Sequence, residues 1–166
     1  MPSVLFVCTG NQFRSPIAAA AFIKKLNDEG SAAGWRVESA GTWTATGQPP
    51  LPEAIQAATL CGLSLEGHTT RLVEASILSP SDLILVMESG QKEAILSEFP
   101  NLLGRVFLLS EVVEGMTYDI SDPLASGENS SDEIAREVRN LVCKGFKKIC
   151  ELARHLHAQM GYSSLL

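Results

Sequence analysis

Long hydrophobic runs are missing from this sequence. A membrane-spanning helix needs about 18–20 consecutive apolar residues, and no segment of the 166-residue chain approaches that length. The N-terminus, Met-Pro-Ser-Val-Leu-Phe-Val, also lacks the basic segment with which a secretory signal peptide begins. These two absences predict a cytoplasmic protein.

Cysteine is scarce, with four residues at positions 8, 61, 143 and 150. None belongs to a close pair of the kind that zinc ribbons and Cys-x-x-Cys redox motifs contain. Cys143 and Cys150 are expected on one helix, where a rise of about 1.5 Å per residue separates their Cα atoms by about 10.5 Å, too far for a disulfide. We therefore expect reduced thiols and no metal site.

Basic residues are outnumbered by acidic ones. Thirteen Lys and Arg against nineteen Asp and Glu give a net charge of -6, which repels a nucleic-acid backbone on average. Neither the Walker A pattern nor a Gly-x-Gly-x-x-Gly motif after a strand occurs. The sequence thus predicts no nucleic-acid partner, no membrane partner and no cofactor.

Short apolar segments alternate with helical patterns along the chain. Strand patterns cover residues 3–7, 36–40, 82–87 and 105–109, and helical patterns cover 15–25, a segment that ends at 61–62, 89–97 and about 131–157. Such alternation is typical of α/β folds, in which helices cover both faces of a parallel sheet. We predict one domain over residues 1–166, a three-layer sandwich with a four-stranded parallel sheet flanked by helices.

The loop between the first strand and the first helix, Cys-Thr-Gly-Asn-Gln-Phe-Arg-Ser-Pro at residues 8–16, concentrates the chemistry. Ligands of doubly wound sheets bind beyond the carboxyl ends of the strands, where this loop begins. The spacing from Cys8 to Arg14 lets successive backbone N–H groups point inward and form a nest for an anion. The helix N-terminus adds its positive dipole end, and Arg14 adds a planar pair of donors for phosphate oxygens.

The same donors favour a reactive thiol at Cys8. Cysteines at helix N-termini or beside an arginine ionise more readily than free cysteine, so Cys8 is expected to act as a thiolate nucleophile. Ser15 could donate a hydrogen bond to the sulfur and help it leave in a second step, and it is also the expected helix N-cap. Gly10 and Asn11 tolerate the left-handed backbone that such a loop requires.

The segment at residues 4–16 resembles the signature of the low-molecular-weight protein tyrosine phosphatases. Further matches follow in order: Ser-Ala-Gly-Thr at 39–42, His68, the strand at 82–87 and Asp122-Pro123, so that the resemblance covers residues 4–156. It implies that Cys8 is the nucleophile, Arg14 the phosphate binder and Asp122 the general acid. It also implies a bracing polar network made of Asn11, Ser15, Ser39 and His68.

The candidate substrate-binding residues are Thr9, Gly10, Asn11, Gln12, Phe13, Ser15 and Trp43. Phe13 replaces a second cysteine that many family members carry, so the resemblance implies that their protective disulfide is absent. Leu124 and Ala125 stand where tyrosine-specific members often have aromatic residues, and Trp43 could supply that face instead. Gln12 occupies a position that is often apolar in tyrosine phosphatases and Thr in related arginine phosphatases, and its amide could bind a polar substrate or face water.

The resulting prediction is a protein phosphatase that hydrolyses phosphotyrosine through a covalent phosphocysteine, without a metal. The alternative is a protein-arginine phosphatase on the same scaffold. An arsenate reductase is disfavoured because the family's sister reductases use further cysteines that are missing between residues 61 and 143. A phosphate-binding module without turnover needs neither the thiol nor the acid. Expected partners are a phosphorylated protein or peptide, inorganic phosphate and other oxyanions.

Overall fold

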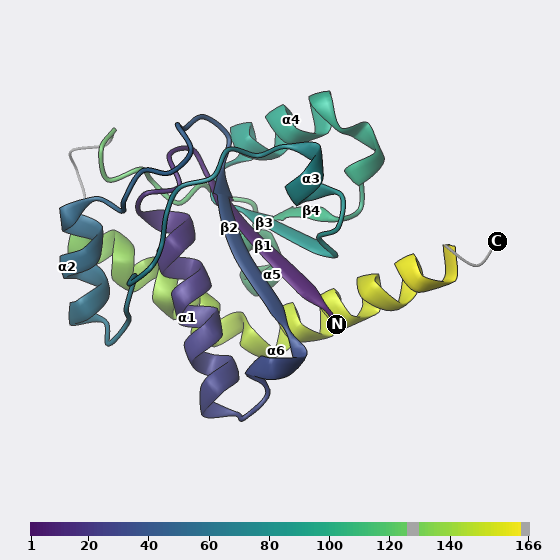
Figure 1. The fold of residues 1–166 in the computed structure, drawn as a ribbon, viewed down its shortest axis with the longest axis horizontal. Coiled ribbons are helices and arrows are strands. Elements are labelled where there is room, and N and C mark those ends of the chain that lie inside the picture. Colours follow the sequence, from purple (N-terminus) through teal and green to yellow (C-terminus); the bar gives the residue numbers. More distant parts are fainter. Residues whose placement is uncertain (126–129, 164–166) are drawn as a thin grey trace.

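The computed structural model describes residues 1–125 and 130–163. One parallel sheet has the strand order β2-β1-β3-β4 (Figure 1), built from β1 (Ser3–Cys8), β2 (Arg36–Gly41), β3 (Leu83–Val86) and β4 (Val106–Leu108). The α-helices are α1 (Arg14–Asp28), α2 (Pro52–Leu60), α3 (Ala75–Leu78), α4 (Ser89–Glu98), α5 (Leu109–Glu114) and α6 (Ser131–Ser163). The predicted four-stranded parallel sheet is confirmed.

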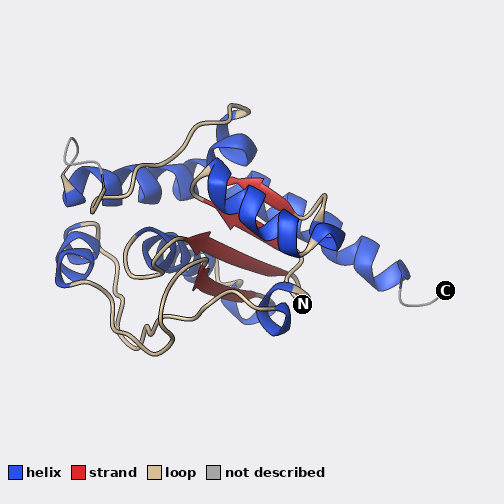
Figure 2. Cartoon of the chain, turned by 90° about the horizontal axis from the view of Figure 1, so that it is seen from above, coloured by secondary structure: helices blue, strands red, loops and turns tan. Residues whose placement is uncertain are grey.

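The central strand β1 is buried on both faces. Successive strand side chains point to opposite faces of a sheet, so Val4 and Phe6 join the core formed with α1, α2, α5 and α6. Leu5 and Val7 join the core on the other face, under α3 and α4. Figures 1 and 2 show the sheet between these two groups of helices. The predicted three-layer sandwich is therefore confirmed.

The carboxyl end of β1 is the point where the direction of the chain through the sheet reverses. The chain passes from β1 to β2 on one side and then crosses to β3 on the other side of β1. Crevices at such switch points bind ligands in open α/β sheets. Cys8, the last residue of β1, pairs with Gly41 at the end of β2, and it therefore lies at this point.

The last helix is longer than predicted. It continues past residue 157 to Ser163, because Ala158, Gln159 and Met160 are good helix formers and no proline interrupts them. Over the described parts of the chain the cysteines are free, with Cys143 exposed and Cys150 buried. Within those parts, no helix combines the length and apolar character needed to cross a bilayer.

Gly145 lets α6 lie close against α5. A Cβ at this position would come within 2.3 Å of Cγ2 of Val113, a buried β-branched side chain with little freedom to move. Overpacking of this kind destabilises the folded state by about 1–3 kcal/mol. The higher helix propensity of alanine relative to glycine offsets up to about 1 kcal/mol of this loss. We expect Gly145→Ala to lower the free energy of unfolding by about 1–2 kcal/mol in denaturant titrations.

Gly90 in α4 provides the matched control, since a Cβ there meets no atom within 4 Å. Gly90→Ala should be neutral or slightly stabilising, because only the propensity gain remains. Equal destabilisation by both substitutions would show that close packing against Val113 is not the cause.

Candidate active site

The Cys8 thiol is buried at the end of β1 and receives hydrogen-bond donors from the loop that follows. The backbone N–H of Asn11 donates to Cys8 Sγ at 3.2 Å, and Ser15 Oγ lies 3.0 Å from the same sulfur. Both groups can stabilise negative charge on sulfur as it forms or leaves. The loop thus places its donors around the thiol in the way that the sequence predicts.

Asn11 is the residue that gives the loop its shape. Its φ of 55° lies in the left-handed region, as predicted, whereas Gly10 does not have a positive φ. The Asn11 side-chain amide donates to Ser15 Oγ at 2.9 Å and to Ser39 Oγ at 3.0 Å. Its Oδ1 accepts a hydrogen bond from the backbone N–H of Arg71 at 2.9 Å. The predicted network of these three polar side chains is therefore present, and Asn11 is its centre.

His68 completes the network from outside the loop. Its Nε2 lies 2.8 Å from the backbone carbonyl of Asn11, and a carbonyl only accepts, so Nε2 carries the proton. Burial lowers the pKa of His68; the hydrogen bond to Asn11 opposes this effect and the nearby Arg71 charge adds to it. His68 is accordingly a neutral donor at neutral pH.

The lowered pKa of His68 predicts a pH dependence of stability. Below its ordinary pKa of about 6.5, the unfolded chain binds a proton that folded His68 still resists, so the free energy of unfolding falls as the pH falls. Urea titrations at about pH 7.5 and 5.5 should show a larger loss for the wild type than for His68→Gln. Parallel pH profiles for the two proteins would contradict this assignment.

Arg14 is the first residue of α1, and its side chain is only 2% exposed. Nη1 donates to the carboxylate of Glu88 and, at 2.8 Å, to the carbonyl of Ile120. Nη2 lies 3.3 Å from Asp122 Oδ2. The structure thus brings Asp122, from the loop after α5, to the arginine of the Cys8 loop across a sequence separation of more than a hundred residues.

Of the two local roles expected of Ser15, the contact with Cys8 is present and the helix N-cap is not. The helix begins one residue earlier, with Phe13 at the N-cap position and no side-chain capping bond, so Ser15 is not the N-cap. Its hydroxyl instead faces Cys8 and Asn11. The competing attraction of these buried partners explains the difference, since a side chain bound to the loop cannot also turn back to cap the helix.

The other predicted substrate-binding residues divide by exposure. Thr9 and Gly10 are half-buried in the loop. Trp43 is 85% exposed, and its backbone N–H donates to the Thr9 carbonyl. Gln12 donates through Nε2 to the carbonyl of Pro49 rather than facing open water. The Phe13 ring belongs to the hydrophobic core, and the residue is 4% exposed.

Glu88 is a site residue that the sequence reasoning missed. It directly follows Met87 at the carboxyl end of β3, next to β1, and its carboxylate is paired with Arg14. The signal was present, because the carboxyl ends of neighbouring parallel strands meet at one edge of a sheet. Glu88 contacts the guanidinium at Nη1, whereas Asp122 contacts it at Nη2.

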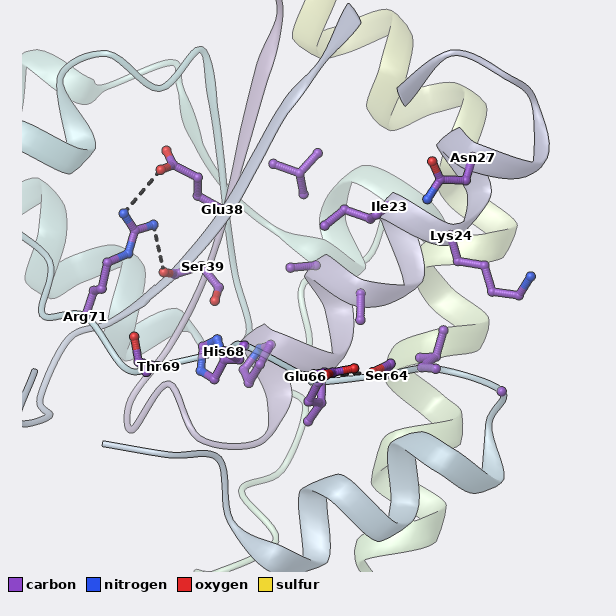
Figure 3. A pocket seen from close by; sticks show the side chains of 18 of the residues that line it. Ile23, Lys24, Asn27, Glu38, Ser39, Ser64, Glu66, His68, Thr69 and Arg71 are labelled. Carbon is purple, nitrogen blue, oxygen red and sulfur yellow. Dashed lines mark hydrogen bonds and ion pairs between the residues drawn. The ribbon is translucent and has the colours of Figure 1, made fainter. Parts of the chain in front are cut away.

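A groove of about 960 Å³ lies behind the Cys8 loop, between α1, β2 and residues 62–71. Figure 3 shows Ser39, His68 and Arg71 along its wall, and the same three residues contact Asn11. Cys8, Arg14 and Asp122 are not among the lining residues. The groove therefore borders the bracing network, whereas the reactive groups converge elsewhere, at the carboxyl edge of the sheet.

Comparison with known proteins identifies the family. The model of the family described as low molecular weight phosphotyrosine protein phosphatase matches residues 3–159. The chain belongs to this family. A probable low-molecular-weight protein-tyrosine-phosphatase, EpsP of Ralstonia nicotianae, is 35% identical over 140 residues, covering 82% of this chain and 90% of the relative. The protein-arginine-phosphatase of Bacillus subtilis is 32% identical over 149 residues, covering 87% and 97%.

Solved structures of low-molecular-weight phosphatases share the fold. A YwlE arginine phosphatase in which serine replaces a cysteine, described as having a phosphorylated active-site serine, matches with a TM-score of 0.83 at 28% identity. The match covers 93% of this chain and 99% of that protein. The family resemblance and the fold class predicted from the sequence are thereby confirmed.

Proposed function

We propose that this low-molecular-weight phosphatase hydrolyses phosphotyrosine in proteins through a phosphocysteine intermediate, as one catalytic domain over residues 1–166 in the cytoplasm. The observation that carries the proposal is the convergence of three groups at one sheet edge. Cys8 lies among N–H and O–H donors, Arg14 closes the same loop, and Asp122 Oδ2 lies 3.3 Å from Arg14 Nη2. A thiol, an anion binder and a carboxyl group together are the requirements for two-step phosphoryl transfer.

In the first step, the Cys8 thiolate attacks phosphorus in line with the ester oxygen. The S–P bond forms as the P–O bond to tyrosine breaks, and the departing oxygen takes a proton from Asp122. Arg14 and the loop N–H groups stabilise the charge on the remaining phosphoryl oxygens, which is the largest contribution to such catalysis.

In the second step, water hydrolyses the phosphocysteine. Asp122, now ionised, takes a proton from water as its oxygen bonds to phosphorus, and the S–P bond breaks to release inorganic phosphate. Ser15 Oγ, 3.0 Å from Cys8 Sγ, donates to the departing sulfur and stabilises the thiolate. Each bond that breaks thus has a group in place to take the charge or proton that results.

The exposed apolar side chains at the site support an aromatic substrate. Trp43 is 85% exposed, its backbone N–H donates to the Thr9 carbonyl, and Leu124, 72% exposed, follows Asp122 by two residues. Apolar walls beside an anion site suit a phosphorylated ring. The amide of Gln12 supports the same reading, since its Nε2 already donates to Pro49.

Phosphoarginine is the second candidate substrate, because a relative named protein-arginine-phosphatase is 32% identical to this chain and covers 87% of it. Two carboxylates, Glu88 and Asp122, contact the Arg14 guanidinium. The same carboxylates could accept hydrogen bonds from the guanidinium of a phosphoarginine substrate. The proposed partners in either case are phosphorylated proteins or peptides and free oxyanions, with no nucleic acid and no membrane.

Matched peptides test the choice of substrate. One peptide sequence is prepared with phosphotyrosine and again with phosphoarginine, and phosphate release gives kcat/KM for each. We expect the phosphotyrosine peptide to be preferred by about 10-fold or more. A preference for phosphoarginine would establish the second candidate, and turnover of neither peptide, nor of p-nitrophenyl phosphate, would overturn the proposed function.

A further inference from the structure

Gln91 is a buried amide that none of the functional roles above uses. It is the third residue of α4, and it is only 4% exposed. A buried amide must find partners for its donors and its acceptor, or it destabilises the fold. The partners of Gln91 all lie at the carboxyl edge of the sheet, next to the Cys8 loop.

The hydrogen bonds of Gln91 fix the orientation of its amide. Oε1 accepts from the backbone N–H of Met87 at 2.9 Å and from that of Glu88 at 3.0 Å. Because a backbone N–H can only donate, Oε1 must face these two groups, and Nε2 must face the other way. Nε2 then donates to Thr9 Oγ1 at 3.1 Å.

This amide joins two parts of the site that come from different strands. On one side, Gln91 holds the backbone of Glu88, whose carboxylate pairs with Arg14. On the other side, it holds the hydroxyl of Thr9, the first residue after Cys8 in the loop. The Thr9 carbonyl in turn accepts a hydrogen bond from the backbone N–H of Trp43. The Gln91 side chain therefore sets the distance between the carboxylate that orients Arg14 and the start of the phosphate-binding loop.

We propose that Gln91 is a positioning residue for phosphoryl transfer. It acts through Glu88 and Thr9, and it does not touch the substrate. The proposal rests on the proposed phosphatase function, since it assigns Gln91 to the alignment of Arg14 with the loop N–H groups. Buried, fully paired networks are stiff, and a displacement of about 1 Å in such a site can cost about 100-fold in rate.

The test compares Gln91→Leu, Thr9→Val and the double variant with p-nitrophenyl phosphate as substrate. Gln91→Leu is expected to lower kcat by about 10–100-fold, and Thr9→Val is expected to lower it in the same direction. If Gln91 and Thr9 both act through the hydrogen bond between them, kcat of the double variant should be no lower than that of the less active single variant. A purely structural role for Gln91 predicts instead that the two losses multiply.

The exposed Gln56 of α2 is the control position, and Gln56→Leu should keep wild-type kinetics. If Gln91→Leu fails to fold by circular dichroism, Gln91→Met replaces it, because the unbranched methionine keeps the length of glutamine. Multiplying losses, or a Gln91 variant that folds and keeps wild-type kcat, would overturn the positioning role. A wild-type protein without turnover would instead overturn the proposed function, so the two failures are distinguishable.

Discussion

Cys8→Ser is expected to reduce kcat by about 10⁴-fold or more, because it removes the proposed nucleophile. A serine hydroxyl does not ionise in the way that a thiol does, and an alkoxide is a far poorer leaving group from phosphorus than a thiolate. If the introduced serine attacks at all, its phosphate ester should accumulate without turnover. A related YwlE protein with such a replacement is described as carrying a phosphorylated active-site serine. Steady-state assays with p-nitrophenyl phosphate and phosphotyrosine peptides measure the loss.

The anion site should survive this substitution. Arg14 and the Asn11 network do not depend on sulfur for their contacts with Glu88, Ser39 and His68, so inorganic phosphate should still bind in calorimetry. Cys143→Ser is the matched control, since Cys143 is exposed on α6. Normal activity of Cys8→Ser, or an equal loss in Cys143→Ser, would show that the mechanism is wrong.

Asp122→Asn is expected to reduce kcat for a phosphotyrosine peptide by about 10²–10⁴-fold, the usual contribution of a general acid or base. Asparagine keeps the shape of the side chain and its bond from the Leu124 N–H, but it cannot release or take a proton. For p-nitrophenyl phosphate, the rate of the first step, phosphorylation of Cys8, should fall less, because its leaving group needs less protonation.

Asp119→Asn is the control for this experiment. Asp119 lies three residues before Asp122 and accepts the Ser89 N–H through Oδ1 at 2.8 Å, which an asparagine oxygen can also do. It makes the same change of charge in the same loop without touching Arg14, so its kinetics should remain close to those of the wild type. A wild-type rate and pH profile for Asp122→Asn would assign the acid to another residue.

The fold was predictable because the strand and helix patterns in the sequence match the strands and helices of the structure. β1, β3 and β4 are short apolar segments, and β2 is of mixed polarity. The helix at Arg14–Asp28 follows its loop directly, so the alternation of strands and helices indicated the three layers. The end of α6 was not predictable, since no breaker follows residue 157. The short α5 was missed because Leu109 begins a helix immediately after β4 ends at Leu108, and no loop separates the two.

The candidate catalytic loop could be proposed because its residues are contiguous, and the candidate acid, Asp122, could be proposed only through the family resemblance. Glu88 and Gln91 were missed because their roles arise from the pairing of β3 with β1 and from contacts across the sheet edge. The direction of the Phe13 ring, which tertiary packing turns into the core, could not be predicted from its place in the loop.

The central claim is that Cys8 carries the phosphoryl group during turnover, and trapping that intermediate tests it most directly. The Asp122→Asn variant lacks the base that activates water, so p-nitrophenyl phosphate should phosphorylate it faster than water can release the group. Rapid acid quench followed by peptide mass spectrometry should then find one phosphoryl group on the peptide that contains Cys8. The account would be contradicted if enzyme quenched during turnover had an unmodified Cys8, or if the phosphoryl group were on another residue.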